Sequence, residues 1–485
     1  MYITEIELSN LRCFQGTHKI SLDRGGGTYA GWTVFAGRNG SGKSTLLKAI
    51  AAAVAGPLAV RSLEGGVPNW LRERSQWAHV KVRVQSGSED RLQRTSSARS
   101  GKSPDVHSSP PRVDLTLGWG KFGSGAPLFL HRSHPKAKVD QGPWHDSPDG
   151  WFLAAYGPHR RLGPVTADIA KVSNDPKLAR LINLFREEST LSDAVDWLKE
   201  QHARSLDRRP GAAALVSEVR ELLNDGLLPD GSVVKGVDSD GLWITRDEVT
   251  VALKQVSDGY RTVTALVVDL VQRLHATYGR LPLERGPAGL ICPLPGVVLV
   301  DEIDAHMHVA WQQKIGVWLT QHFPNLQFLV TSHSPFICQA ASPRGIIRLP
   351  GPGEHRKIEH LDPRLFHAVV NGGADDAVMS ELFGLDHAHS ARAEALRQQV
   401  AQLELKMLQG TATEKEQQQY LDDRGLLPDG LGELADRKLR MLQSRRAPAR
   451  KKTPARKPAR ASKKAAARKR APASEKARAG RARTR

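Results

Sequence analysis

Unbroken apolar runs mark the strands of this chain more clearly than any other pattern. Residues 297–300 are apolar throughout, and residues 326–330 are apolar at all but one position. Strands buried on both faces of a parallel sheet have this composition, because neither face meets water. A third β-prone run at 32–36 is followed, over 46–54, by apolar residues at helical spacing. Strands alternating with helices in this way predict an α/β fold built on a parallel or mixed sheet.

Between these runs the pattern changes twice. Residues 77–156 contain several β-like runs and are predicted to form a β-rich insertion. Within it, the Ser/Arg/Pro-rich stretch 86–112 is predicted to be a mobile loop. Residues 175–225 carry apolar side chains at helical spacing and predict a helical segment. No sustained heptad repeat occupies the region, which excludes a long coiled-coil arm.

The C-terminal part changes style again. Over residues 390–442 apolar side chains recur at spacings of four, three and four, Gly410 ends this run, and Thr413 with Glu416 forms a capping box. These signals predict a helical hairpin that packs on the head or on a partner. We therefore divide the chain into a head at 1–362, a helical region at 363–444 and a tail at 445–485.

The net charge of +19 is concentrated in that tail. Residues 445–485 hold 18 Lys and Arg side chains against one acidic residue, Glu475, so the rest of the chain is close to neutral. The tail is Ala/Pro/Lys/Arg-rich with no apolar periodicity, which predicts disorder. A chain of this kind binds DNA or RNA through phosphates, without base stacking because it has no aromatic residue. The alternative is a solvated tail with incidental affinity for polyanions.

Other composition signals bound the setting. The N-terminus has a strand pattern with Glu5 and Glu7 in place of a signal peptide, and no apolar stretch approaches the roughly 20 residues that span a bilayer. Cys13, Cys292 and Cys338 show no metal or disulfide spacing and are expected to be reduced, mostly buried thiols. We expect a cytoplasmic protein of more than one domain that does not bind membranes.

A complete phosphate-binding loop of the form G-x-x-x-x-G-K-S follows the first predicted strand. The residues expected to surround the phosphates of ATP are Gly37, Arg38, Asn39, Gly40, Ser41, Gly42, Lys43, Ser44 and Thr45. Glycines let backbone N–H groups curl around phosphate oxygens, and the following helix adds its positive N-terminus. Lys43 is expected to contact the β- and γ-phosphates, and the Ser44 hydroxyl to ligate Mg²⁺. The alternative is a Gly-rich turn with a chance lysine.

Polar residues also end the two most apolar runs. Asp301 and Glu302 follow residues 297–300, as in a Walker B motif. Asp301 is expected to hold Mg²⁺ through water, and Glu302 to polarise the attacking water. His333 follows the run at 326–330, where an imidazole could contact a γ-phosphate. The alternatives are an acidic turn after a strand and a structural histidine.

A fourth motif, Val256-Ser257-Asp258-Gly259-Tyr260, precedes a strongly apolar helix. By itself it could be an ordinary Ser/Asp N-cap. The order of the four motifs resembles that of ABC-type ATPases, in particular the RecF/SMC-like branch of the AAA-family ATPases. The opening of residues 2–14 and the sequence D-E-I-D-A-H-M-H at 301–308 are similar to those of OLD-like and Septu-type (PtuA-like) defence ATPases. The resemblance covers roughly residues 1–350 and implies an ABC-type head with an antiparallel β-subdomain and a helical lid.

The resemblance also implies roles for individual residues. Two heads would enclose two ATP molecules as a homodimer, with Ser257 and Gly259 of one chain capping the γ-phosphate held by Lys43 of the other. Glu302 would be the catalytic base and His333 the switch histidine. Asp304 would lie in a loop that signals across the dimer, and Arg12 would contact nucleotide.

The chain departs from the family pattern in two places. Tyr260 stands where transporter ATPases have glutamine, and no Q-loop glutamine is evident. Residues 156–161 follow a predicted strand and could take the place of the Q-loop. The alternative for Arg160 and Arg161 is a solvated turn.

The acidic and histidine residues raise two further possibilities, a metal site and a nuclease site. Asp304, His306 and His308 have spacing that could bind zinc or manganese, although the resemblance explains them as a dimer-facing loop. Asp375, Asp376 and Glu381 are the only acids near the place of a topoisomerase-primase nuclease domain, and they lie in a helical context. We infer that the chain lacks its own nuclease, so that any cutting would need a separate effector protein.

The leading hypothesis is an enzyme, a Mg²⁺-dependent ATPase whose dimer closes on ATP and reopens on hydrolysis. This switch would control nucleic acid or an effector partner in phage defence or DNA repair. One alternative is the ATPase subunit of a transporter, which the S-D-G-Y and D-E-I-D-A-H sequences disfavour. The other is a non-catalytic nucleic-acid-binding scaffold locked by ATP, which the intact Lys43, Asp301, Glu302 and His333 disfavour.

Overall fold

The computed structural model describes most of the chain in two compact units, Met1–Ala388 and His389–Arg485. The described residues are 1–93, 106–108, 112–121, 129–132, 142–144, 148–229, 231–287, 289–354, 356–383 and 389–427. The basic tail at 445–485, with its predicted disorder and nucleic-acid contact, lies outside the described residues. Each unit is described below by itself.

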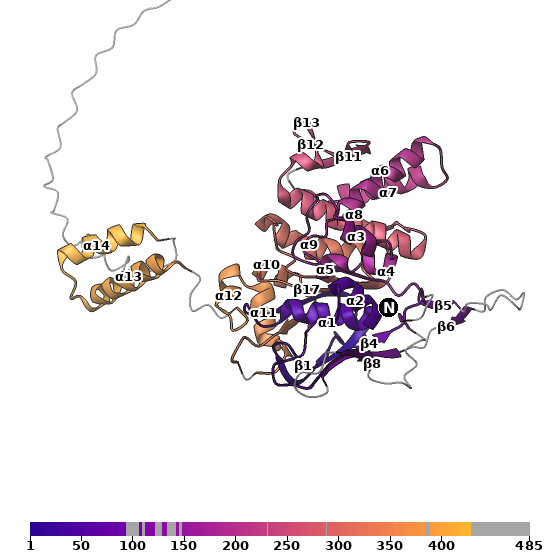
Figure 1. Ribbon diagram of the computed structural model, residues 1–485. Coiled ribbons are helices and arrows are strands. Elements are labelled where there is room, and N and C mark those ends of the chain that lie inside the picture. Colours follow the sequence, from indigo (N-terminus) through magenta and orange to yellow (C-terminus); the bar gives the residue numbers. More distant parts are fainter. Residues whose placement is uncertain are drawn as a thin grey trace, which may run out of the picture. The chain divides into compact units, whose positions relative to one another are not determined.

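A six-stranded sheet forms the centre of the first unit (Figure 1). Its strands, in spatial order, are β10 (Leu153–Tyr156), β16 (Gly296–Val300), β17 (Leu326–Thr331), β3 (Gly31–Ala36), β18 (Ile346–Arg348) and β19 (Glu359–His360). Neighbouring strands are parallel except for the last pair, β18 and β19. The three strands predicted from the apolar runs are β16, β17 and β3, and they lie side by side.

The two faces of this sheet enter two different cores, which explains the unbroken apolar runs. In β16, Val298 and Val300 pack into one hydrophobic cluster, whereas Val297 and Leu299 pack into the other. Successive side chains of a strand point to opposite faces, so burying both faces requires an apolar residue at every position. Helix α1 (Lys43–Ala55) covers one face, and α8 (Asp258–Tyr278) and α9 (Val309–His322) cover the other (Figure 1).

A five-stranded antiparallel sheet packs on the far side of α1. Its order is β2 (Phe14–Ser21), β1 (Tyr2–Leu11), β4 (Trp77–Gln85), β7 (Arg112–Gly120) and β8 (Phe129–Arg132). The predicted insertion at 77–156 is therefore not a separate unit. Its first strand pairs with β1, and its last strand, β10, belongs to the central sheet. The α/β class, the mixed sheet and the antiparallel subdomain are confirmed.

The prediction of a mobile loop at 86–112 is wrong for part of that stretch. Strands β5 (Arg91–Gln93) and β6 (Val106–Ser108) pair with β9 (Pro148–Asp149) in a three-stranded sheet, and β7 begins at Arg112. A composition rich in Ser, Arg and Pro concealed these short strands, because three residues are too few for an alternating pattern. Residues 94–105 and 109–111 lie outside the described residues.

Further helices of the head are α2 (Pro57–Glu64), α3 (Ala167–Ser173), α4 (Pro176–Ala179), α5 (Ile182–Phe185), α6 (Ser192–Leu206), α7 (Ala212–Asn224) and α10 (Pro335–Gln339). A three-stranded sheet of β11 (Val233–Asp238), β12 (Gly241–Arg246) and β13 (Val249–Ala252) leads through a short 3-10 turn, Leu253–Gln255, to α8. The hairpin of β14 (Glu284–Gly286) and β15 (Gly289–Ile291) precedes β16. Helices α6 to α9 and strands β11 to β13 lie above the central sheet in Figure 1, and α2 packs beside α1.

The head extends beyond its predicted end at residue 362. Helices α11 (Pro363–Asn371) and α12 (Ala374–Met379) contribute Val369 and Ala377 to the same hydrophobic cluster as α8 and α9. Both side chains are fully buried. The predicted boundary was too early because periodicity marks a helix such as α11 but does not say which core that helix joins.

The second unit is a helical hairpin. Helices α13 (Ala391–Gln409) and α14 (Glu414–Gly425) enclose a small core of Val400, Leu403, Met407, Tyr420 and Leu427. Gly410 takes the left-handed conformation, with φ of 78°, that ends α13. Thr413 and Glu416 form the predicted capping box at the start of α14.

The Gln327 side chain joins the six-stranded sheet of the head to its five-stranded sheet. Gln327, on β17, is fully buried, and its Oε1 accepts a hydrogen bond of 2.7 Å from the backbone N–H of Ile3. Its Nε2 donates to the carbonyl oxygen of Ile3 at 2.8 Å. The amide therefore satisfies both backbone groups of a buried residue in β1, which explains the one polar residue within the apolar run at 326–330.

Replacing Gln327 with Leu should therefore destabilise the head. The N–H and C=O of Ile3 would lose their partners while staying buried, at a cost of about 1–3 kcal/mol for each. Urea unfolding of Gln327→Leu and wild type measures the difference. Gln313→Leu on the exposed face of α9 is the matched control and should change stability little. An equal effect of both substitutions would contradict this account.

Candidate functional site

Four neighbouring parallel strands end at one edge of the central sheet, and each is followed by a predicted motif. The phosphate loop follows β3, Asp301 and Glu302 follow β16, His333 follows β17, and the turn at 157–161 follows β10. Parallel strands present their carboxyl ends together, and ligands of open α/β sheets bind in the crevice there. Segments far apart in the chain are therefore brought to one place.

A cavity of about 310 Å³ opens at this edge. Its lining contains Arg12, Cys13, Asn39, Gly40, Gly42, Lys43, Ser44, Thr45, Glu302 and His333. Nine of these ten are residues that the sequence analysis selected, and Cys13 is the addition. Of the other predicted residues, Arg38, Ser41 and Asp301 lie directly beside lining residues in the chain, and the carbonyl oxygen of Gly37 accepts a hydrogen bond from the lining residue Lys43. Ser257 and Gly259 do not line the cavity.

Gly42 has no room for a side chain, which fixes the shape of the phosphate loop. Its φ is 90°, a conformation that favours glycine, and a Cβ atom would collide with Cys13 Sγ and lie 2.7 Å from Phe14 Cζ. The turn between β1 and β2 therefore packs directly against the loop. Cys13 is exposed, unlike the buried Cys292 and Cys338, so the expectation of mostly buried thiols fails for this residue.

The Lys43 ammonium lies inside the phosphate loop. Its Nζ donates hydrogen bonds to the carbonyl oxygens of Gly37 at 2.9 Å and Arg38 at 3.2 Å, and the residue is 7% exposed. Burial lowers the pKa of Lys43, although the nearby carboxylates of Asp301, Glu302 and Asp304 raise it. The loop thus holds a desolvated cation that an incoming anion would stabilise.

The Thr331 hydroxyl connects the two acidic residues after β16. It donates a hydrogen bond to Asp301 Oδ1 at 2.6 Å and accepts one from the Glu302 backbone N–H at 2.7 Å. Thr331 is fully buried and Asp301 is 2% exposed, whereas Glu302 faces the cavity. Glu302 has a φ of 44°, which a residue with a side chain adopts only where its surroundings hold it. The sequence analysis gave Thr331 no role, because its hydroxyl acts across 30 residues of chain.

His333 stands at the end of β17 with its side chain exposed toward the cavity. Partial burial and the Lys43 ammonium lower the pKa of His333, so the imidazole is neutral at neutral pH. The next residues on either side are anchored. Ser332 Oγ donates to Asp304 Oδ1 at 2.5 Å, and Ser334 Oγ donates to Gln312 Oε1 at 2.8 Å.

The fourth motif, residues 256–260, is called here the signature segment. It leads into α8, and none of its residues lines this cavity. Ser257 is the exposed N-cap residue, and its side chain makes no capping hydrogen bond. Gly259 is buried, and a Cβ there would lie 3.0 Å from Trp311 and 3.2 Å from the carbonyl oxygen of His306. Tyr260 packs edge-on against Trp311, with ring centroids 4.5 Å apart. The helix start is thus fixed against the loop that follows Asp304.

Arg12 lines the cavity from the antiparallel sheet. Its φ is 47°, its backbone N–H donates to the carbonyl oxygen of Trp70 at 2.8 Å, and its guanidinium lies 5.0 Å from the centroid of the Trp70 ring. This cation–π contact directs the side chain along the cavity wall.

The two arginines in the turn after β10 differ in their exposure to solvent. Arg161 is exposed, as the solvated-turn alternative expects. Arg160 is 1% exposed, so for this residue that alternative is wrong. Its guanidinium donates hydrogen bonds to the carbonyl oxygens of Gly157, Asp301 and Glu302 at 2.6, 2.9 and 3.0 Å.

The histidines after Asp304 have separate surroundings. His308 is the N-cap of α9, and its Nδ1 accepts a hydrogen bond from the Ala310 N–H at 3.3 Å. His306 is exposed, with a φ of 64°. Within the described ranges no three His, Cys, Asp or Glu side chains are grouped so as to hold a metal ion.

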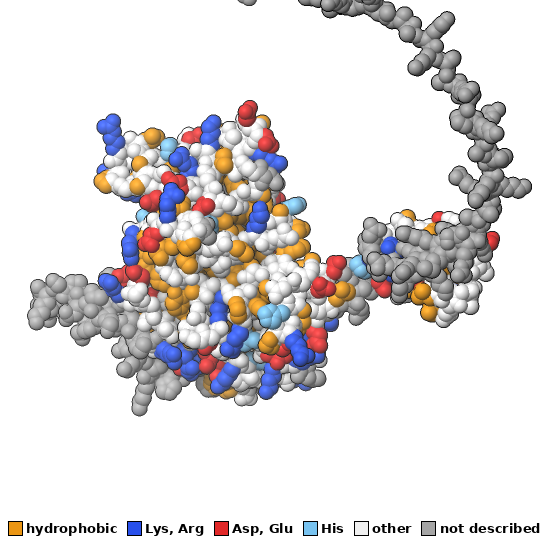
Figure 2. All heavy atoms as spheres, turned by 180° about the vertical axis from the view of Figure 1, so that it is seen from behind, with side chains coloured by type: hydrophobic (Ala, Val, Ile, Leu, Met, Phe, Trp, Pro, Cys, Tyr) orange, Lys and Arg blue, Asp and Glu red, His pale blue; other side chains and the backbone are white. Residues whose placement is uncertain are grey.

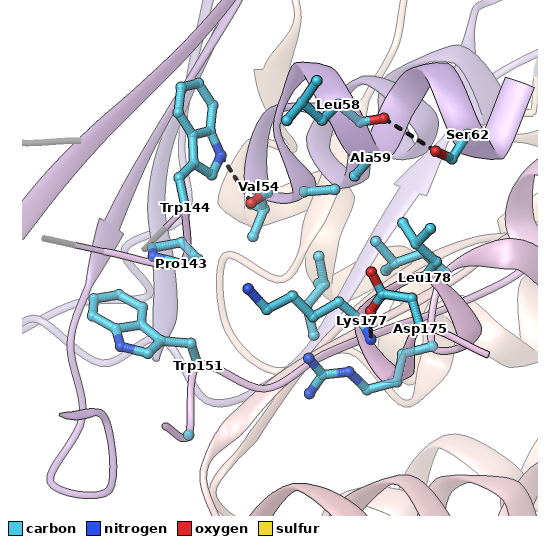
Figure 3. A pocket seen from close by; sticks show the side chains of 15 residues that line it. Val54, Leu58, Ala59, Ser62, Pro143, Trp144, Trp151, Asp175, Lys177 and Leu178 are labelled. Carbon is cyan, nitrogen blue, oxygen red and sulfur yellow. Dashed lines mark hydrogen bonds between the residues drawn. The ribbon is translucent and has the colours of Figure 1, made fainter. Parts of the chain in front are cut away.

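A second cavity of about 310 Å³ lies at the other end of α1 (Figure 3). Val54, Leu58 and Leu178 line it together with Trp151 and Lys177. It shares no lining residue with the cavity at the phosphate loop. The motif residues therefore single out the cavity at the sheet edge.

Family comparisons agree with the motif order. Residues 163–339 match the family model described as "AAA domain, putative AbiEii toxin, Type IV TA system", and residues 5–108 match one described as "AAA domain". The chain is 36% identical over 107 residues to the Retron Ec83 probable ATPase of Escherichia coli, covering 22% of this chain and 18% of that protein. It is 24% identical over 347 residues to the Septu protein PtuA of Bacillus mycoides (strain KBAB4), covering 71% of this chain and 39% of that protein. The chain thus spans less than half the length of these relatives.

Two solved structures of SMC heads are similar to this chain at low scores. An SMC head bound to the C-terminal winged-helix domain of ScpA superposes with a TM-score of 0.42 at 16% identity, covering 75% of this chain and 99% of that one. The SMC head domain from Thermotoga maritima gives a TM-score of 0.37 at 14% identity, covering 75% and 100%. In the part of the chain that the structure describes, no helix is both long and apolar enough to cross a bilayer.

Replacing Thr331 with Val should destabilise the segment that carries Asp301 and Glu302. Valine keeps the shape but leaves the Glu302 N–H without its acceptor and Asp301 without its donor, which should cost about 1–3 kcal/mol of stability. Thermal unfolding of Thr331→Val against Thr320→Val measures this, since Thr320 bonds only to carbonyl oxygens of its own helix. Equal unfolding temperatures for both variants would argue against the bridging role.

The lowered pKa of His333 predicts a stability that declines on acidification. In the unfolded chain histidine titrates near an ordinary pKa of about 6.5. As pH falls through that value the unfolded state binds a proton that folded His333 does not, so the folded state loses stability until the lower folded pKa is passed. Urea unfolding at pH 7.5 and 5.5 should show a smaller decline for His333→Asn than for wild type. Identical declines would refute the shift.

Proposed function

We propose, from a chain that carries AAA-family ATPase domains, that this protein is a Mg²⁺-dependent ATPase that dimerises through its ATP sites and controls an effector or a nucleic acid. The names of its relatives, Septu protein PtuA and Retron Ec83 probable ATPase, favour a role in antiviral defence over one in DNA repair. The defence role, the dimer and the coupling are all parts of the proposal.

One observation carries it. A single cavity joins the phosphate loop after β3, a histidine after the adjacent strand β17 and an acidic side chain after β16, the next strand in the sheet. Lys43 supplies a partly desolvated cation for phosphate, Glu302 a carboxylate that faces the cavity, and His333 a neutral imidazole. This combination suits phosphoryl transfer, in which most catalysis is positioning and electrostatic stabilisation.

The donor set fits Mg²⁺. The Ser44 hydroxyl lines the cavity, and the Asp301 carboxylate lies one residue from Glu302, so oxygen ligands of the kind that Mg²⁺ prefers are available from both motifs. When bound, the ion would neutralise charge on the phosphates of ATP. Ser44 and Asp301 would hold it, and Glu302 would orient and deprotonate the attacking water.

The exposed signature segment supports the dimer. Ser257 offers an uncommitted hydroxyl at the N-terminus of a 21-residue helix, yet it does not line the cavity of its own chain. A γ-phosphate held by Lys43 of a second copy would be a suitable partner for such an N-terminus. Gly259, packed against Trp311, would keep the segment rigid during that contact.

Nucleic-acid engagement is assigned to the basic tail. On the face of the head in Figure 2, Lys and Arg side chains are interspersed with Asp and Glu and form no continuous basic stripe. The tail instead concentrates 18 Lys and Arg side chains in residues 445–485. Contacts of that kind would be independent of sequence and strongly weakened by salt.

The decisive measurement is ATP turnover by the purified protein with and without double-stranded DNA. Glu302→Gln should lower turnover by about 10²–10⁴-fold, because it removes the base, and should keep nucleotide binding. Chelation of Mg²⁺ should abolish turnover. Glu284→Gln, on the exposed hairpin of β14 and β15, is the matched control and should be as active as wild type.

A chain ending at Gln443 separates the roles of head and tail. DNA stimulation that is lost in this shorter chain would support the nucleic-acid switch. DNA-independent turnover in both chains would favour a protein partner. No turnover by wild type under any of these conditions would contradict the ATPase and leave the ATP-locked scaffold.

A further inference from the structure

Among the described residues, Arg160 is the most deeply buried Lys or Arg side chain, and the sequence motifs leave its role open. It follows β10 by four residues and is 1% exposed. Its Nη1 donates to the carbonyl oxygens of Gly157 and Asp301, and its Nη2 donates to those of Glu302 and Ile303 at 3.0 and 3.2 Å. One guanidinium thus binds three consecutive carbonyls of the segment that carries the acidic pair.

The chemistry of the guanidinium suits this task. Its planar fork presents donors in fixed directions, and it can bind several carbonyls at once in a way that an ammonium cannot. Burial lowers the pKa of Arg160 to about 10, with the charges of Asp301, Asp304 and Glu302 opposing the shift, so the group stays cationic at neutral pH. Its bonds go to main-chain oxygens, so the acidic side chains remain available to a ligand.

The segment that Arg160 holds needs support. Glu302 has a φ of 44°, a conformation that costs free energy in a residue with a side chain. Its N–H is bound by Thr331, and its C=O is bound by Arg160. With both backbone groups fixed, the direction in which the Glu302 side chain leaves the backbone is also fixed.

The turn that carries Arg160 is itself anchored at its start. The Gly157 N–H donates to Asn183 Oδ1 at 3.0 Å, and a Cβ on Gly157 would lie 2.5 Å from the carbonyl oxygen of Asn183, so only glycine fits. The preceding Tyr156 donates its hydroxyl to Asp269 Oδ2 on α8 at 2.8 Å, in the fully buried core. Residues 156–160 therefore touch the signature helix at one end and the Glu302 backbone at the other.

We propose that Arg160 is a positioning residue that aims the Glu302 carboxylate by holding the main-chain carbonyls of residues 301–303. The proposal rests on the ATPase activity proposed above and names the residue that takes the place of a Q-loop glutamine beside the acidic pair. Arg160 does not touch nucleotide and acts only through the backbone of Glu302.

Arg160→Lys tests the proposal, because lysine keeps the charge and loses the planar fork. The turnover number should fall by about 10²-fold, the size of effect that a misplaced catalytic group produces. The affinity for ATP, measured with a fluorescent analogue, should change less than about twofold, since Lys43 and the loop amides are untouched. Arg180→Lys is the matched control. Arg180 is a half-buried arginine whose pKa is likewise lowered to about 10, but it bonds to Thr277 on α8, and its variant should keep wild-type turnover.

Two further readouts separate positioning from a general loss of structure. In the Glu302→Gln background, Arg160→Lys should have no additional effect on turnover, because there is no base left to aim. Hydrogen exchange of the backbone amides of residues 302–305 should be faster in Arg160→Lys than in wild type, with amides of α13 and α14 unchanged.

Additive losses with Glu302→Gln, unchanged exchange at 302–305, or an equal loss of turnover in Arg180→Lys would each overturn the proposal. If wild type hydrolyses no ATP, the proposed function fails, and the exchange rates alone decide whether Arg160 holds the segment. If Arg160→Lys does not fold, Arg160→Gln undergoes the same measurements, since its shorter amide adds no buried charge.

Discussion

A parallel sheet buried on both faces leaves little place for polar chemistry except the ends of its strands. In this head, α1 covers one face of the central sheet and α8 and α9 cover the other, so the side chains along β16 must be apolar. Polar groups can follow only where the strands stop. The phosphate loop, the acidic pair and the histidine all occupy that edge, and the rest of the head supports it. The covering of both faces of the sheet therefore explains both the apolar strands and the position of the candidate site at the strand ends.

The support consists largely of side chains bonded to main-chain groups. Gln327 satisfies the backbone of Ile3, and Thr331 and Arg160 hold the backbone of Glu302 from two sides. Each is a polar residue buried in an apolar region, which is costly unless its hydrogen bonds are made. Since each bond joins segments distant in sequence, Thr331 and Arg160 tie strands together at the edge where the cavity forms, and Gln327 ties β1 to the opposite end of β17.

Local pattern was enough to predict the elements that carry their own signal. The strands β3, β16 and β17 follow from apolar runs, and the hairpin of α13 and α14 follows from periodicity and a capping box. Short strands such as β5 gave no periodic signal, which is why the loop at 86–112 was misjudged. Helix α11 does carry an apolar stripe, but a stripe does not say which core a helix joins, and so the boundary at 362 was placed too early.

Site residues divide in the same way. Those within a contiguous motif, such as Lys43 and Glu302, were found from sequence because their spacing in the chain is the geometry of the site. Thr331 was given no role, and Arg160 was left open between a replacement for the Q-loop and a solvated turn, because their partners lie 30 and 141 residues away in the chain. Nothing in the residues next to Arg160 distinguishes it from Arg161, and only the fold buries one and exposes the other.

The hydroxyl of Thr331 has one proton, so the hydrogen bonds that link Glu302, Thr331 and Asp301 all run in one direction. The Glu302 N–H points to the oxygen of Thr331, and the proton of Thr331 points to Asp301. Hydrogen bonds in such a chain polarise one another, so their strengths rise and fall together. A cation that draws charge from the Asp301 carboxylate weakens the bond it accepts and, through Thr331, the grip on the Glu302 amide. The Asp301 carboxylate and the backbone N–H of Glu302 are thus coupled through the Thr331 hydroxyl. A positive charge placed near Asp301 weakens the hydrogen bond that holds the Glu302 N–H.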